Sequence, residues 1–247
     1  MFEKVPEFAS IILEGMLLTV EATLGGIALA TVLAVIFGLA LLSRFRAVRA
    51  VARVYVEIWR GTSEVVQLLW IAFVLPVLTG FQIVPMAVGI LVLGANFGAY
   101  GAEIVRGAVQ SVPKAQHEGA VALNLTPAQR MRRVILPQAL VEMVPPFNNL
   151  FIQLLKGSAL LTIIGVAEMT RQAHRVVLPR NISEAATIWT IVLVFYLVLA
   201  ILITMGMRLL ERRAAALVGR TPPPRQAFFS SFNRNKDLGL ADSKGVK

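Results

Sequence analysis

Long runs of apolar residues without any charge are the feature that most constrains how this chain can fold. Three of them cover residues 22–42, 65–102 and 185–207. About 20 consecutive apolar residues are enough for a helix to cross a bilayer. Hydrophobic residues make up 57% of the chain, whose mean hydropathy is +0.73, and this composition is too apolar for a water-soluble domain. The chain is therefore predicted to be an all-α protein that crosses the membrane several times.

Five membrane spans are expected along the chain. The run from residue 65 to residue 102 holds two of them only if the first starts earlier, near Glu57. The five spans then cover residues 11–42, 58–78, 85–104, 144–167 and 185–207. Together they form one membrane domain over residues 11–210. Residues 1–10 precede it as a short periplasmic segment, and the polar, Pro-rich residues 211–247 are expected to be a disordered tail.

Lysine and arginine predict the orientation of these spans. With the N-terminus outside, ten Lys and Arg residues fall in the two inner loops and four in the outer segments. The C-terminal tail, also inside, adds nine more. Loops rich in Lys and Arg stay in the cytoplasm, so the N-terminus is expected outside and the C-terminus inside. Membrane topology therefore explains the formal net charge of +10, and nucleic acid is not expected as a partner.

Residues 113–137, between the third and fourth spans, have the pattern of two short polar helices joined by a turn. Pro113 suits the first helical position, where its missing N–H would have no partner. Asn124 suits a left-handed stop at the end of the first helix. Thr126, with Gln129 three residues later, forms a capping box for the second helix. The sequence therefore predicts a cytoplasmic helix–turn–helix within a loop over residues 107–140.

Pro137 is expected to end the second helix, because a proline disfavours helical backbone at the residue before it. A helix–turn–helix of this length is too short to be a domain. Its apolar stripe needs a surface to pack on. That surface is either the membrane domain of the same chain or a soluble partner, and the residues alone favour the two interpretations equally.

Polar residues inside the expected spans are candidates for a solute path. Lys156 lies about 12 residues inside the fourth span. An ionisable group at that depth is a candidate functional residue, although a lysine can also extend along a polar seam between helices. Asn96, Tyr100 and Glu103 are the polar groups among the small residues of the third span.

Small residues mark two further positions. Residues 61–63, Gly-Thr-Ser, lie near the cytoplasmic end of the second span and indicate either a broken helix or an ordinary packing surface,. Gly94 and Gly98 have the four-residue spacing that lets two helices approach closely.

Several kinds of chemistry have no basis in the sequence. It contains no G-x-x-x-x-G-K-[ST] phosphate loop, so the chain is not expected to hydrolyse ATP itself,. It has no H-E-x-x-H spacing, and His117 and His174 are isolated, so neither a metal nor another cofactor is expected,. It has no Cys and hence no disulfide,. A transporter is therefore favoured over a membrane enzyme, and a self-sufficient secondary carrier is the main alternative to a subunit of a larger machine.

Several stretches of the chain resemble the permeases of ABC importers. Glu118, Gly119 and Ala120, the turn at Asn124 and the end of the loop at Pro137 resemble the EAA loop of that family. The family usually has Ala at the position of Gly119 and Gly at that of Asn124. Asn can adopt the required turn, and Gly119 costs up to about 1 kcal/mol of helix propensity relative to Ala.

The resemblance covers residues 13–177. Within the permeases, the chain is most similar to the polar amino-acid branch. The stretches that carry it are residues 56–62, 99–103, 155–158 and 164–166. Residues 61–70, 122–124 and 129–133 look most like the permeases of ectoine and hydroxyectoine importers. Histidine, arginine, glutamine, glutamate, cystine and opines are the alternative solutes that this branch implies.

Membership of such a family implies a permease subunit in the bacterial inner membrane that works with other chains. It implies a second permease subunit, a dimer of ABC ATPase subunits and an external solute-binding protein, with no cofactor on the permease. The residues that it implies for coupling to the ATPase are Glu118, Gly119, Ala120, Asn124, Arg132, Arg133 and Pro137. The two arginines would pair with acidic groups of the ATPase or with lipid headgroups. Ectoine and amino acids are zwitterions, which suits a path that holds both a carboxylate and an ammonium group, such as Glu103 and Lys156.

Overall fold

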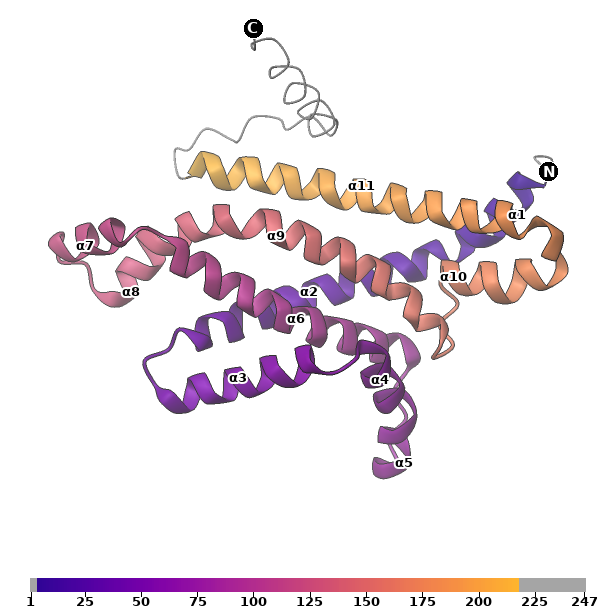
Figure 1. The fold of residues 1–247 in the computed structure, drawn as a ribbon, viewed down its shortest axis with the longest axis horizontal. Coiled ribbons are helices and arrows are strands. Elements are labelled where there is room, and N and C mark those ends of the chain that lie inside the picture. The colour runs from indigo at the N-terminus through magenta and orange to yellow at the C-terminus, as the bar shows by residue number, and fades with distance from the viewer. Residues whose placement is uncertain (1–3, 218–247) are drawn as a thin grey trace, which may run out of the picture.

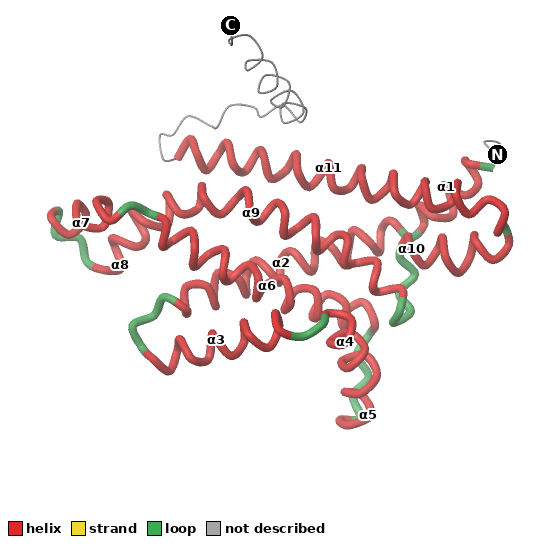
Figure 2. Tube along the Cα trace, in the orientation of Figure 1, coloured by secondary structure: helices red, strands yellow, loops and turns green. Residues whose placement is uncertain are grey.

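The structure of the protein, a computed structural model, describes residues 4–217. This part of the chain is built from helices and contains no strand (Figure 2), so the all-α prediction is confirmed. Lipid offers the backbone no hydrogen-bond partners, and a helix satisfies its own N–H and C=O groups. The last helix, α11 (Ala185–Leu217), continues seven residues into the expected tail. Residues 1–3 and 218–247, which include the rest of that tail, lie outside the described residues.

Two long helices form the centre of the bundle. A short helix α1 (Val5–Glu14) leads into α2 (Met16–Leu41), which packs along α6 (Pro85–Ser111) (Figure 1). A Cβ atom on Gly94 would lie 2.6 Å from a methyl carbon of Leu29, and one on Gly98 would lie 2.9 Å from Cβ of Leu33. Only glycine permits this approach, so the predicted close packing at this pair is confirmed.

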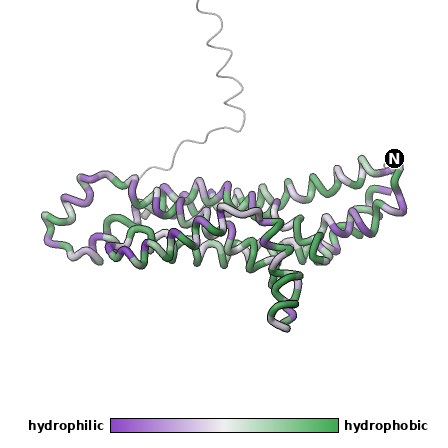
Figure 3. The backbone as a smooth tube through the Cα atoms, turned by 60° about the horizontal axis from the view of Figure 1, so that its bottom comes forward, coloured by the Kyte–Doolittle hydropathy of each residue, from purple (hydrophilic) through white to green (hydrophobic). Residues whose placement is uncertain are grey.

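The second expected span is bent. Helix α3 (Arg46–Gly61) is followed by α4 (Glu64–Leu69), the π-helical residues Trp70–Val74 and α5 (Leu75–Thr79). The axis turns by 99° at residues 62–63, and α4 and α5 leave the bundle as an arm (Figures 1 and 3). The broken helix, one of the two interpretations of residues 61–63, is therefore confirmed, and a span over residues 58–78 stays a prediction.

The fourth expected span also has different bounds. Helix α9 (Leu136–Gly157) begins well before residue 144 and contains Pro145 and Pro146 in its interior. It ends at Gly157, and a 3₁₀ turn (Ser158–Thr162) follows. The chain then folds back through the short helix α10 (Met169–Arg171), the π-helical residues Gln172–Val177 and two 3₁₀ turns, Leu178–Arg180 and Ile182–Glu184.

Three helices of the described residues are long and apolar enough to cross a membrane: α2, α6 and the segment Ile182–Ala216 that contains α11. The bent pair formed by α3 and α4–α5 brings this number to four. Helix α9 has 22 residues, but polar groups such as Asn149, Gln153 and Lys156 interrupt its apolar sequence. Five spans therefore stay a prediction. Figure 3 shows that hydrophilic residues gather in the loop between α6 and α9.

The outer faces of α2 and α11 suit contact with lipid. Large apolar side chains such as Leu24, Val32, Leu193 and Leu197 are more than half exposed there. The opposite faces of these helices contribute to two buried apolar clusters, one around α2, α6 and α9 and one around α1, α10 and α11. The apolar sequence therefore supplies both the core and the surface that the bilayer covers.

Candidate functional site

The loop between α6 and α9 forms the predicted helix–turn–helix. Its first helix, α7 (Lys114–Ala122), has Pro113 as its N-cap, one position before the expected place. Asn124 adopts a left-handed conformation with φ of 53°. Its N–H donates to the carbonyl of Val121 at 2.9 Å, and the N–H of Leu125 donates to that of Ala120 at 3.1 Å. This pair of bonds is the Schellman motif, so the predicted role of Asn124 is confirmed.

The second helix, α8 (Pro127–Arg130), starts with the predicted capping box. The hydroxyl of Thr126 accepts from the N–H of Gln129 at 3.3 Å, and the Gln129 side chain accepts from the N–H of Thr126 at 3.0 Å. Both bonds satisfy N–H groups that a helix start leaves unpaired.

The predicted end of this helix at Leu136 is wrong. Helix α8 continues through the π-helical residues Met131–Ile135 directly into α9. In this wider turn, the N–H of Leu136 donates to the carbonyl of Met131, five residues earlier. Pro137 lies in the first turn of α9, where the lack of an N–H is tolerated. The helix–turn–helix, residues 114–135, is therefore joined to α9 without a loop; we call it the coupling hairpin.

The coupling hairpin presents an exposed surface of mixed character. Ala120 and Ile135 are buried, and Pro137 is half-buried. The other residues implied in coupling are exposed: Glu118, Gly119, Asn124, Arg132 and Arg133. Val121 is 53% exposed and Leu123 75% exposed beside them. Gln138 donates to Gln116 at 3.1 Å and ties α7 to α9.

Asn96, a candidate for the solute path, is buried beside the bend after α3. It is 4% exposed, and its amide nitrogen donates to the carbonyl of Trp59 at 2.8 Å and to Gln67 at 3.0 Å. Gln67 donates to the same carbonyl at 3.0 Å and to the hydroxyl of Thr62 at 2.6 Å. The carbonyl of Trp59 would lack a helical partner at the break, and these amides satisfy it.

A pocket of about 370 Å³ lies between α3 and α6, next to this bend. Tyr100 and Glu103, two of the candidates, line it together with Arg53, Glu57 and Arg60. The guanidinium carbon of Arg60 lies 4.9 Å from the centroid of the Tyr100 ring, within the range of a cation–π contact. The volume of the pocket falls within the range of small-molecule sites.

Glu103 is also held from its own helix. Arg106, one turn further along α6, donates from Nε to Oε2 of its carboxylate at 2.8 Å, and Nη2 forms an ion pair with the same oxygen at 2.6 Å. The same guanidinium donates to Gln110 at 3.0 Å. The carboxylate is therefore fixed in position beside the pocket while remaining partly exposed.

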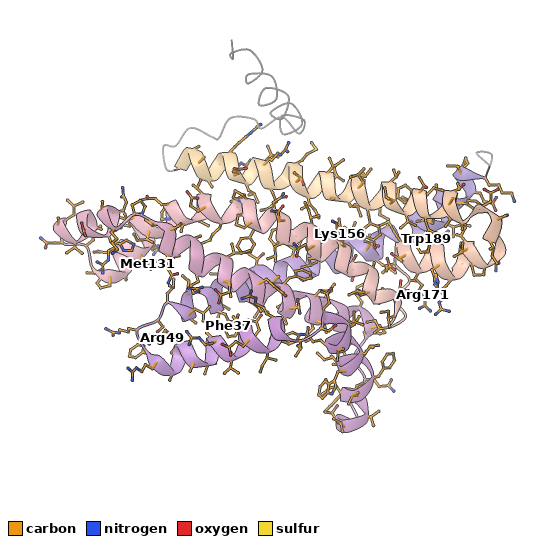
Figure 4. The ribbon with its side chains drawn as sticks, in the orientation of Figure 1. Phe37, Arg49, Met131, Lys156, Arg171 and Trp189 are labelled. Atoms are coloured by element: carbon orange, nitrogen blue, oxygen red, sulfur yellow. The ribbon has the colours of Figure 1, made fainter. Side chains whose placement is uncertain are left out.

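Lys156, the fourth candidate, does not line this pocket. It is exposed on α9 and belongs to a stripe of exposed polar residues at intervals of seven, four and three residues, Glu142, Asn149, Gln153 and Lys156. Figure 4 shows Lys156 away from both ends of the bundle. Exposed polar groups in the interior of a membrane helix face protein or water rather than lipid. The stripe therefore indicates that α9 turns this face to an aqueous space or to another subunit.

A buried carboxylate forms a fourth polar cluster that the sequence did not single out. Glu168 is 0% exposed. It accepts from the N–H groups of Thr170 at 2.7 Å and Arg171 at 2.8 Å, from the hydroxyl of Tyr196 at 3.1 Å and from that of Thr162. The one local signal for it is that an acidic residue directly follows the charge-free residues 157–167.

The Glu168 cluster joins four elements at the end of the bundle opposite the coupling hairpin. Thr162 ends the turn after α9, residues 170 and 171 belong to α10, and Tyr196 belongs to α11. The backbone N–H of Met169, the residue after Glu168, donates to the hydroxyl of Thr19 on α2 at 3.2 Å. The cluster therefore fixes the fold-back after α9 against the rest of the membrane domain.

The described residues contain no group of three or more acidic, His or Cys side chains that could hold a metal ion. The geometry therefore supplies an exposed hairpin of mixed apolar and charged character at one end, a charged pocket and a polar stripe on the helices, and a buried carboxylate at the other end.

Comparison with known proteins identifies the family. The family described as the binding-protein-dependent transport system inner membrane component matches residues 7–216. The chain belongs to this family of ABC importer permeases. A solved structure of an amino acid ABC transporter with histidines has a TM-score of 0.77 and 31% identity over 86% of this chain and 98% of that one. The methionine transporter MetNI, at a TM-score of 0.69 and 21% identity over 83% of this chain and 96% of that one, shares the fold.

Curated relatives of this permease are named for amino-acid transport. A probable amino-acid ABC transporter permease of Sinorhizobium fredii, y4tF, is 39% identical over 80% of this chain and 84% of its own length. The glutamine permease GlnP of Escherichia coli is 37% identical over 84% and 94%. The L-cystine permease TcyB of Bacillus subtilis is 33% identical over 86% and 90%. The chain is therefore a non-catalytic permease subunit of an amino-acid ABC importer in the inner membrane, and its family implies ATPase and solute-binding partners.

Replacing Glu168 with Ala is expected to destabilise the permease, because two backbone N–H groups and two hydroxyls lose a buried acceptor. Unpaired buried donors cost about 1–3 kcal/mol each, so the midpoint of thermal unfolding of the purified complex should fall by several degrees. Glu14→Gln, at an exposed position, is the matched control. Equal midpoints for Glu168→Ala and Glu14→Gln would contradict the structural role of the cluster.

Proposed function

We propose that this permease passes a polar amino acid into the cell, driven by ATP hydrolysis on its partner subunits. The observation that carries the proposal is the pocket between α3 and α6, where a guanidinium from Arg60 and carboxylates from Glu57 and Glu103 line one space. A free amino acid has an α-carboxylate and an α-ammonium group. A pocket lined by both positive and negative side chains therefore suits both charged groups of the solute. The amino-acid names of the relatives support the same solute class.

Ectoine and hydroxyectoine, which the sequence favoured, have no counterpart among the relatives described above. They are zwitterions as well, so the charges of the pocket do not separate them from amino acids. We therefore place a polar amino acid such as glutamine, histidine, arginine or glutamate first, and keep ectoine as a competitor in the transport assay.

The solute path that we propose runs along the polar faces of α3, α6 and α9. Tyr100 and Glu103 contribute from α6 and Lys156 from α9, while Asn96 is a positioning residue that supports the bend next to Arg60. The pocket opens at the surface of the single chain. A second permease subunit, identical or a sister chain, would complete the wall of the path.

The proposed orientation has the N-terminus outside and the C-terminus inside. Figure 1 shows the coupling hairpin, the start of α3 and the end of α11 at one end of the molecule, with α1 and α10 at the other. The basic residues of the α2–α3 turn therefore share an end with those of the hairpin, which supports a cytoplasmic location for that end.

Coupling in this proposal passes from the ATPase through the hairpin into α9. Exposed Val121 and Leu123 offer apolar contact, and Glu118, Arg132 and Arg133 surround them with charge. ATP can shift the permease between inward- and outward-facing states only if the ATPase binds the hairpin differently in each. Because the hairpin is continuous with α9, such a difference acts on the helix that carries Lys156.

Glu118→Lys and Leu123→Asp are each expected to weaken ATPase binding by about tenfold or more. The first reverses a charge in the proposed docking surface, and the second places a negative charge at an exposed apolar position of that surface. The measurement is the ratio of ATPase to permease after affinity purification of the complex. Glu7→Lys, exposed at the opposite end of the chain, is the control. An unchanged ratio in both hairpin variants would show that the ATPase docks elsewhere.

Lys156→Ala is expected to lower ATP-driven uptake about tenfold or more while the complex still assembles, since a charge that meets the solute is lost. Lys156→Arg keeps the charge and should retain part of the uptake. Wild-type uptake by Lys156→Ala would remove Lys156 from the path.

The decisive test is uptake into vesicles that hold the complete complex, its binding protein and internal ATP. Labelled glutamine, histidine, arginine, glutamate and ectoine are each offered, and unlabelled versions of the other solutes compete. ATP-dependent uptake of an amino acid supports the proposal. Uptake of ectoine that only hydroxyectoine inhibits would contradict the solute class, and uptake without ATP would indicate a self-sufficient carrier.

A further inference from the structure

An apolar groove of about 360 Å³ lies between the end of α2 and the start of α3, separate from the charged pocket. It is lined by Ile36, Phe37 and Ala40 of α2 and by Ala47, Val48 and Val51 of α3. Behind it, the rings of Phe37 and Tyr55 stack with centroids 3.8 Å apart. The hydroxyl of Tyr55 donates to the carbonyl of Ala95 on α6 at 2.7 Å. The groove is thus apolar and has a wall anchored to the core.

Basic residues surround the end of this groove. Four arginines occur within residues 44–53, and no acidic residue lies between Glu21 and Glu57. Arg49 donates to the carbonyls of Ser43 at 2.7 Å and Arg44 at 3.3 Å and so holds the turn. Figure 4 shows Arg49 and Phe37 near the same end of the molecule.

Two of these arginines are free to bind a ligand. Arg44 and Arg46 are exposed, within one helical turn of Ala47 in the groove. In the described part of the chain, neither takes part in a salt bridge. The guanidinium carbon of Arg44 lies 4.9 Å from the ring of Phe45, a side chain that is 58% exposed. A cation beside an exposed aromatic ring is typical of the membrane–water interface.

The surface next to the groove is apolar and suits contact with lipid. Val32, Val35 and Ile36 are exposed on the same helix, at 55%, 43% and 55%, and no polar stripe like that of α9 interrupts them. An acyl chain therefore reaches the groove from the bilayer without crossing a polar surface.

We propose that the groove and its two arginines bind one anionic phospholipid of the cytoplasmic leaflet. An acyl chain fills the apolar groove, and the phosphate-bearing headgroup lies against Arg44 and Arg46. The assignment to the cytoplasmic leaflet rests on the proposed orientation of the permease. A neutral lipid would fill the groove as well, but it would leave two adjacent positive charges without a counter-charge.

The test is native mass spectrometry of the assembled permease–ATPase complex in detergent. The complex is stripped of lipid and then given equal amounts of phosphatidylglycerol and phosphatidylcholine with the same acyl chains. The wild type is expected to retain more phosphatidylglycerol. In the double variant Arg44→Gln/Arg46→Gln, the ratio of retained phosphatidylglycerol to phosphatidylcholine should fall about fivefold for each charge removed.

Matched controls separate this site from general attraction to basic protein. Arg175→Gln/Arg180→Gln removes two exposed arginines at the other end of the molecule and should leave the preference unchanged. Arg44→Lys/Arg46→Lys should keep most of it. If the wild type shows no preference, or if the Gln variant keeps the full preference, the proposal is overturned.

A second variant tests the groove with the arginines intact. Ala47→Phe fills the groove and should abolish retention of the tightly bound phosphatidylglycerol while the thermal midpoint of the complex stays close to that of the wild type. Wild-type retention in this variant would overturn the acyl-chain part of the proposal. Because lipid retention is measured without transport, its failure is distinct from failure of the amino-acid uptake described above.

Discussion

The fold depends on one constraint: inside a membrane, a backbone group that leaves its helix must find a partner from the protein. Each unsatisfied group in hydrocarbon costs several kcal/mol. At the bend after α3, the carbonyl of Trp59 is satisfied by the side chains of Gln67 and Asn96. At the fold-back after α9, Glu168 accepts from the N–H groups that begin α10. At both departures from straight helices, buried polar side chains, Asn96 and Glu168, therefore satisfy the freed backbone groups, and Gln67 assists Asn96.

The parts of the structure that the sequence predicted are those that neighbouring residues determine. The turn at Asn124 and the capping box at Thr126 need only residues three to five apart, and both are present. The close packing at Gly94 and Gly98 follows from side-chain size alone. The all-α class and the long apolar helices follow from composition and from the absence of water in the bilayer.

The parts that the sequence did not predict depend on distant residues. Pro137 normally ends a helix, but a π-helical turn before it carries the chain on, and no local pattern announces that turn. The 99° bend was expected only as a break, since its angle depends on α6. Glu168 acquires its role from Tyr196, 28 residues later. Among the four solute-path candidates, only exposure in the folded chain separates buried Asn96 from Tyr100, Glu103 and Lys156.

No loop separates the second helix of the coupling hairpin from α9, so the two form one continuous helical segment. From Pro127 to Gly157 the helical path is roughly 45 Å long at 1.5 Å per residue. Its regular backbone hydrogen bonding is interrupted at two places, the π-helical turn at residues 131–135 followed by Pro137, and the pair Pro145 and Pro146,. Helices bend most readily at such interruptions. In the proposed coupling route, the stiffness of these two places therefore sets how much of a movement at the hairpin reaches the far end of α9.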